Sequence, residues 1–261
     1  MKLFDSHCHI DDRAYSDDIE DVKKRMAEAG VAAAMIVGIN RKSSKKAVAM
    51  ADAEERFYAS VGVHPHDAQG CSEDTVRFLA KLAQNPKVRA WGEIGLDFNR
   101  MYSPQADQEK WFVRQLEAAQ DLNLPLIFHE RDSRGRFLEM LKSCFKNENK
   151  GVVHCFSGNK AELKDYLDMG LYIGITGILT IESRGADLRK LVGSIPQDRI
   201  LIETDAPYLT PAPQKNHTRR NEPAFVKSVL LTLARVRNQT PETLSSVLWE
   251  NTCRLFEIGD K

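Results

Sequence analysis

The chain has 261 residues, a length that one α/β barrel commonly fills. Lys and Arg together number 37, as do Asp and Glu, so the formal net charge is zero. An anionic partner would therefore be attracted by a local patch or a metal rather than by the whole surface. The early Asp5 leaves no room for the apolar part of a signal peptide. The apolar run 31–39 is too short to span a bilayer. Five cysteines without a Cys-x-x-Cys motif argue against a disulfide framework. We expect a cytoplasmic protein with no membrane contact and no obligate protein partner.

Short apolar runs that end on polar residues recur along the chain and predict β-strands. In chain order the strands are expected over residues 3–9, 32–39, 58–64, 88–96, 125–130, 151–156, 171–176 and 199–204. Amphipathic patterns between them predict helices over 17–29, 104–122 and 162–169, and two final helices over 223–237 and 241–256. Ser103 is the expected N-cap of the helix that begins at Pro104.

Alternation of strands and helices is typical of a parallel sheet. Eight such units favour a single (β/α)₈ barrel, a TIM barrel, formed by residues 1–261 as one domain, with an open doubly wound sheet as the alternative. Ligand-type residues occur from the first strand to the last, whereas in an open sheet they would gather at one switch point. We therefore predict the closed barrel, with a metal site at the C-terminal mouth of the strands.

The first strand ends in His7-Cys8-His9. Because side chains alternate along a strand, His7 and His9 point to one side and Cys8 to the other, so two imidazoles can bind one metal. The alternative is that one histidine is an ordinary core residue. Asp5 and Asp11 lie close enough in sequence to act as outer carboxylates.

Three further strands end on metal-binding side chains. Glu93 lies in an apolar strand between two glycines, and such a buried carboxylate must be paired with an arginine or bind metal. We favour a carboxylate that bridges two cations. His129 and His154 end consecutive apolar runs and add nitrogen ligands suited to zinc or manganese and, less well, to magnesium.

The last strand ends in Glu203-Thr204-Asp205-Ala206-Pro207. A carboxylate at Asp205 can bind a metal and accept a proton from an attacking water. The alternative, that Asp205 caps a helix, is disfavoured because Pro207-Tyr208 is typical of a loop.

Candidate substrate contacts follow the same strand ends. Arg131 follows His129, Arg220 lies in the basic loop 215–220, and both could bind phosphate. His64, at the end of the third strand, could contact substrate or shape a loop. The sequence contains no Walker loop, Rossmann fingerprint, Gly-x-Ser-x-Gly elbow or His-Glu-x-x-His motif.

Taken together, these motifs resemble those of the TatD family of metal-dependent deoxyribonucleases, which are amidohydrolase-like TIM barrels. The resemblance rests on segments 5–9, 62–66, 92–97, 154–158 and 203–208, and it runs from Asp5 to about Phe256. It implies two divalent metals: His7, His9 and Asp205 would bind one, His129 and His154 the other, and Glu93 would bridge them. Glu130 departs from the family pattern, but strand alternation points it away from the metals.

The resemblance also implies an activity, a 3′–5′ exodeoxyribonuclease acting on single-stranded DNA ends. We expect the metals to activate a water and Asp205 to take its proton. Glu93 would bridge the metals, and Arg131, Arg220 and His64 would contact the phosphodiester and stabilise the charge that builds up on it. Two alternatives remain open: hydrolysis of another ester or amide, such as D-aminoacyl-tRNA, and a non-enzymatic binding role.

Overall fold

In the computed structural model, which describes residues 1–144 and 150–259, a closed parallel sheet forms the centre of the molecule. Each strand pairs with its neighbour in sequence, from the first to the eighth. The strands are β1 (Leu3–Cys8), β2 (Val31–Val37), β3 (Phe57–Val61), β4 (Val88–Asp97), β5 (Leu126–Arg131), β6 (Gly151–Val153), β7 (Tyr172–Ile175) and β8 (Ile200–Ile202). The sheet closes where the chain beyond β8 meets β1: Asp205 N donates to His7 O at 2.9 Å, and His9 N donates to Ala206 O at 2.7 Å. The predicted (β/α)₈ barrel is confirmed.

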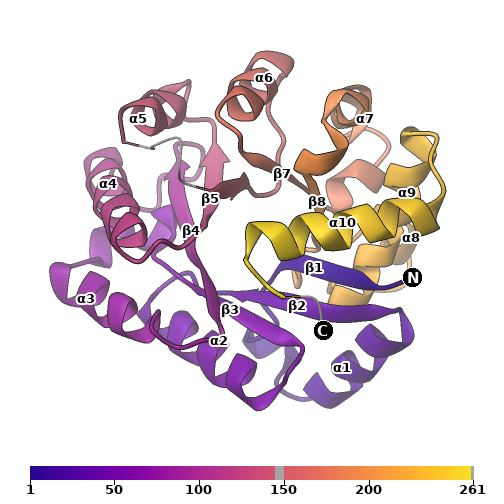
Figure 1. The fold of residues 1–261 in the computed structure, drawn as a ribbon, viewed down its shortest axis with the longest axis horizontal. Coiled ribbons are helices and arrows are strands. Elements are labelled where there is room, and N and C mark those ends of the chain that lie inside the picture. The colour runs from indigo at the N-terminus through magenta and orange to yellow at the C-terminus, as the bar shows by residue number, and fades with distance from the viewer. Residues whose placement is uncertain (145–149, 260–261) are drawn as a thin grey trace.

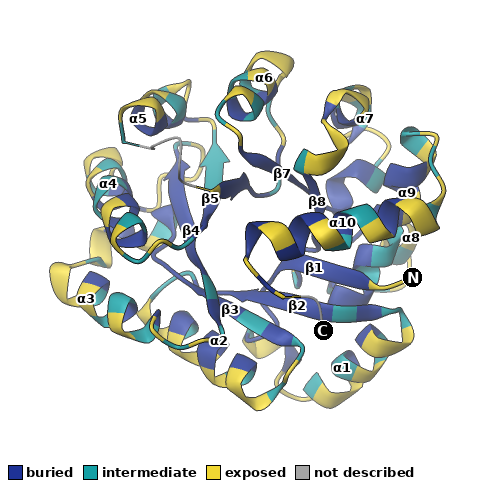
Figure 2. Cartoon of the chain, viewed as in Figure 1, coloured by how far each residue is buried: buried dark blue, intermediate teal, exposed yellow. Residues whose placement is uncertain are grey.

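Helices surround the strands (Figure 1) and turn their apolar faces to them, while their outer faces are exposed (Figure 2). Within the described ranges, none of them has the length and apolarity to cross a membrane. The α-helices are α1 (Ile19–Glu28), α2 (Arg41–Ala53), α3 (Glu73–Leu82), α4 (Gln105–Asp121), α5 (Arg136–Cys144), α6 (Lys160–Asp168), α7 (Ala186–Leu191), α8 (Ala212–Lys215), α9 (Val226–Val236) and α10 (Pro241–Leu255).

Some predicted boundaries need correction. β3 ends at Val61 rather than at His64, and β6 ends at Val153 rather than at Phe156, because the chain turns into the mouth loops before the polar residues. The expected cap at Ser103 is wrong, since Pro104 is the N-cap of α4. Ser103 instead donates its hydroxyl to His66 O at 2.8 Å and fixes a mouth loop.

The barrel interior is layered. Its lower layer is an apolar cluster of inward-facing strand residues, closed by Leu255, Phe256 and Ile258 at the end of α10. The layer above it is polar, because the next inward position on a strand lies two residues further along. Thus Ile127 is followed by His129, Val152 by His154, and Leu201 by Glu203. The organisation of 1–261 as one domain stays a prediction.

Candidate metal centre

Two irregularities in strand pairing lie at the expected ligands. The register of β1 shifts between Asp5 and Cys8, and that of β4 shifts between Trp91 and Ile94, so one extra residue stands beside each partner strand. Such bulges re-aim a side chain next to an active site. Here they accompany the inward placement of His7 and Glu93. Gly95 is needed nearby, since its φ is +148° and a Cβ there would lie 1.8 Å from His129 O.

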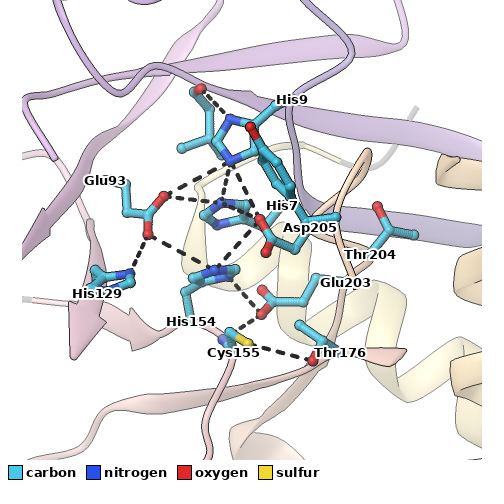
Figure 3. A network of polar contacts seen from close by, with 12 residues as sticks. His7, His9, Glu93, His129, His154, Cys155, Thr176, Glu203, Thr204 and Asp205 are labelled. Atoms are coloured by element: carbon cyan, nitrogen blue, oxygen red, sulfur yellow. Dashed lines mark hydrogen bonds and ion pairs between the residues drawn. The ribbon is translucent and has the colours of Figure 1, made fainter. Parts of the chain in front are cut away.

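On one side of the Glu93 carboxylate, donor atoms of β1 and of the chain after β8 converge (Figure 3). His7 Nε2 lies 3.2 Å from His9 Nε2 and 3.3 Å from Glu93 Oε2. Asp205 Oδ1 lies 3.4 Å from His9 Nε2 and 3.8 Å from His7 Nε2. His154 lies between the two sides of Glu93: its ring stacks on that of His7 with centroids 3.5 Å apart, and its Nε2 lies 3.8 Å from Asp205 Oδ1 and 3.9 Å from Glu93 Oε1.

These spacings fit a metal ion. For nitrogen and oxygen ligands about 2.0–2.1 Å from a tetrahedral ion, neighbouring ligand atoms stand about 3.3 Å apart. Three distances among His7, His9, Glu93 and Asp205, of 3.2, 3.3 and 3.4 Å, agree with that edge length, and the distances from His7 to Asp205 and from His9 to Glu93 are longer, at 3.8 and 4.0 Å. The buried donor set of imidazole and carboxylate groups suits a divalent cation.

On the other side, Glu93 Oε1 faces three imidazoles. It lies 2.8 Å from His129 Nδ1, 3.4 Å from His64 Nε2 and 3.9 Å from His154 Nε2. His64, His66 and His129 form a second group whose donor atoms come within 4.8 Å of one another. Both oxygens of one buried carboxylate are therefore surrounded by metal-binding nitrogens. His66 joins this group although the sequence reasoning left it without a specific role.

Two carboxylates outside this ring were not assigned from the sequence. Asp97 Oδ2 lies 2.7 Å from His66 Nε2 and 3.2 Å from His129 Nε2. Glu203 Oε1 lies 2.8 Å from His154 Nδ1 and accepts a hydrogen bond from Cys155 N at 2.6 Å. Each carboxylate orients an imidazole. A signal existed for Asp97, since it stands four residues after Glu93 and so shares its face of the strand.

Asp5, one of the two expected outer carboxylates, takes another place. Asp5 accepts from Thr204 N at 2.8 Å and from Thr204 Oγ1 at 2.5 Å, so it joins β1 to the segment after β8. The side chain of Glu130 accepts from Ser133 N and Oγ and points away from Glu93, as predicted. Gly174 makes room for Glu203, because a Cβ there would lie 2.7 Å from the Glu203 carboxylate.

Burial and neighbouring charges set the protonation of the centre. Burial alone would raise the pKa of Glu93, but the facing imidazoles, including the hydrogen-bonded His129, hold that pKa well below its usual range. Burial lowers the pKa of His64 to about 4, so this imidazole is neutral at pH 7. Burial also acts to lower the pKa of His129, but hydrogen bonds with Asp97 and Glu93 prevail and raise it to about 9. The anionic carboxylates therefore stay charged and ready to bind a cation.

The two candidate arginines differ. Arg131 shares the strand face of His129 at the mouth, and across the described part of the chain its guanidinium has no hydrogen bond or ion pair. Arg220 donates to both carboxylate oxygens of Asp18, at 2.7 and 2.6 Å, and to Glu222 at 3.1 Å. Its substrate role stays a prediction, and its guanidinium is already engaged in fixing the loop.

Comparison with known proteins shows which family has this sequence and fold. The family model described as TatD related DNase matches residues 4–257. A protein of Klebsiella pneumoniae named 3′-5′ ssDNA/RNA exonuclease TatD is 39% identical over 258 residues, which cover 98% of each chain. Its namesake from Salmonella typhimurium is 38% identical, covering 98% of this chain and 99% of that one. The crystal structure of YJJV, a TatD homolog from Escherichia coli k12, superposes with a TM-score of 0.90 at 28% identity, covering 98% of both chains. The predicted resemblance to an amidohydrolase-like, metal-dependent hydrolase is confirmed, and the chain belongs to the TatD related DNase family.

Proposed function

We propose that this protein is a two-metal 3′–5′ exonuclease that removes nucleotides from single-stranded ends, of DNA first and of RNA as well. Relatives that match nearly the whole chain carry the name 3′-5′ ssDNA/RNA exonuclease TatD. The zero net charge fits an enzyme that grips one end of a strand, since coating a long duplex would need many phosphate contacts.

The position of Glu93 carries the two-metal proposal. Its Oε2 faces His7 and its Oε1 faces His129, at 3.3 and 2.8 Å, so each oxygen can serve a separate cation. His7, His9, Asp205 and Glu93 would hold one ion, and Glu93, His129 and His154 the other. Zinc, manganese or magnesium ions bound there would lower the pKa of a water and neutralise charge on phosphate.

The side chains around Glu93 have distinct tasks in this proposal. Asp205 Oδ1 stands at the edge of the donor set, where it can orient a water and accept its proton. Glu203 holds His154 so that Nε2 points to Glu93 and Asp205. Arg131 has its donors available for a phosphate, and neutral His64 can donate or accept a hydrogen bond there.

The test is digestion of single-stranded DNA and RNA of one sequence, labelled at the 5′ end, by protein loaded in turn with Zn, Mn and Mg. We expect stepwise shortening from the 3′ end and a loss of about 10²–10⁴-fold in rate for Asp205→Asn, the range of a lost general base. Metal analysis of the wild type and of Asp205→Asn shows whether the variant loses activity because it lacks the general base or because it binds less metal. Intact nucleic acid with every metal would overturn the substrate assignment and direct attention to other esters and amides.

A further inference from the structure

Exposed aromatic rings gather at the mouth of the barrel. Among the described residues, the large apolar side chains that stay exposed are Met1, Met101, Tyr102, Tyr208 and Leu231. Tyr102, 63% exposed, follows β4, and Tyr208, 54% exposed, follows β8, so both stand beside the candidate metal centre. A tyrosine combines an apolar ring with a polar tip, and an exposed tyrosine ring beside a site is suited to contact a bound ligand.

Each tyrosine ends a row of rings that begins at the centre. One row runs from Tyr208 to His9 to His7, with centroids 6.1 and 5.0 Å apart. The other runs from Tyr102 through His66 and His64 to His129, with successive centroids 4.8, 4.2 and 4.4 Å apart. Glu93 stands between the two rows, since Oε2 faces His7 and Oε1 faces His129. The tyrosines therefore flank the carboxylate from opposite rows.

The tyrosine rings keep a face free. The Tyr102 ring is inclined by 73° to that of His66, and the Tyr208 ring by 66° to that of His9, so neither is covered by a parallel imidazole. An exposed aromatic face beside a charged centre can accept a nucleobase by offset stacking.

Hydrogen bonds anchor the two backbone segments that carry the tyrosines. Asn221 Nδ2 donates to Tyr208 O at 2.6 Å, and Tyr208 N donates to Asp205 O at 2.8 Å. Beside Tyr102, the Ser103 hydroxyl bonds to His66 O at 2.8 Å and accepts from Gln69 N at 2.9 Å. An anchored backbone limits the conformational entropy that is lost when a base stacks on the ring it carries.

We infer that Tyr102 and Tyr208 are stacking platforms for the two unpaired bases on either side of the phosphodiester that is cleaved. The inference rests on the proposed nuclease function and specifies how that site holds its substrate. Stacking uses the face of the base, which every base has, and ignores the 2′-hydroxyl, so DNA and RNA ends are both accepted. A base within a duplex has no free face, which restricts the site to single-stranded ends.

Binding is the first measurement, made with a chelator so that no cleavage occurs. Fluorescence anisotropy of a labelled single-stranded DNA should give a Kd that rises roughly 5- to 150-fold for Tyr102→Ala or Tyr208→Ala, the range expected for one lost base stack. Tyr102→Phe and Tyr208→Phe keep the ring and should bind like the wild type. Leu231→Ala removes another exposed apolar side chain, on the outer face of α9, and should leave Kd unchanged.

A second measurement removes the base instead of the ring. Oligonucleotides with an abasic site at the terminal or the penultimate position are digested by the metal-loaded enzyme. If each tyrosine stacks on one base, its alanine variant raises KM on the intact strand but not on the strand that lacks that base.

The outcomes separate the two proposals. A wild type that shortens the strand while both alanine variants bind as it does would overturn the stacking role and leave the nuclease intact. Equal losses for phenylalanine and alanine would also overturn it, since they would implicate the hydroxyl. A wild type that degrades no nucleic acid with any metal would overturn the nuclease and, with it, this inference.

Discussion

On the side of Glu93 that holds His7, His9 and Asp205, neighbouring donor atoms stand 3.2 to 3.8 Å apart, the spacing of ligands around an ion. On the side of His129, both ring nitrogens already face carboxylates, Glu93 at 2.8 Å and Asp97 at 3.2 Å, which is the spacing of hydrogen bonds. The first side can take a cation with little rearrangement. An ion on the first side would replace the hydrogen bond between His7 Nε2 and His9 Nε2, whereas an ion on the second side would replace a stronger hydrogen bond from His129 to a carboxylate. The two sides are therefore prepared for a cation to different degrees.

The largest expected effect concerns metal content. We predict two bound ions of unequal affinity, with dissociation constants at least about tenfold apart, because a hydrogen bond to a charged carboxylate contributes about 1.5 kcal/mol or more. His9→Gln should lose the tighter ion and His129→Gln the weaker one. Stepwise chelation followed by metal analysis measures the affinity of each ion. Loss of both ions at the same chelator concentration would contradict the predicted difference in affinity.

A smaller effect is expected from the outer carboxylate. Asp97→Asn should weaken the ion on the His129 side by about 10–100-fold, as for other partners of metal ligands, and leave the His9 side unchanged. Asp67→Asn is the matched control, since Asp67 is an exposed carboxylate that accepts from Asn40 in the neighbouring loop. Isothermal titration with metal compares them, and an equal effect on both ions would mean that Asp97 supports the whole mouth.

The two candidate arginines differ in the same way, since the guanidinium of Arg131 has no partner among the described residues and that of Arg220 is already hydrogen-bonded. Arg131→Gln should raise KM for single-stranded DNA by about tenfold, the worth of one charge-assisted hydrogen bond to phosphate. Arg220→Gln should leave KM nearly unchanged, since its donors are bonded to Asp18 and Glu222. Steady-state kinetics at matched metal content decide between them, and a larger KM effect at Arg220 would support its predicted substrate role.

The smallest effect concerns stability. The guanidinium of Arg220 lowers the pKa of Asp18 below its usual 3.8. A carboxylate with a depressed pKa in the folded state stabilises the protein above the unfolded-state value, and that contribution disappears as the pH falls through the folded-state value. Asp18→Asn should therefore lower stability by up to about 1 kcal/mol at pH 7, the usual limit for an exposed pair. Thermal unfolding at pH 7 and near pH 3 tests this, because the difference from wild type should shrink at the lower pH.

Much of the candidate site follows from local pattern. An apolar run that ends on a ligand-type residue indicates a strand, and alternation then shows which side chains point inward, so His129 and His154 follow from Ile127 and Val152. The closed barrel followed from the number of such units and their spread along the chain. The predicted ends of the strands were less accurate, because the residue at which the chain leaves a strand depends on hydrogen bonding to the neighbouring strands.

Other features depend on distances between strands that no local pattern contains. Asp18 and Arg220 are 202 positions apart, yet they share two hydrogen bonds. The pairing of Glu203 with His154 depends on the register of β6, β7 and β8 and on the space left by Gly174. The sequence by itself determined that His129 and His154 face the barrel interior and what chemistry they offer, because side-chain direction repeats along a strand without bulges. Only the tertiary structure decided which of them meet, because barrel closure and the bulges in β1 and β4 set the separations between strands.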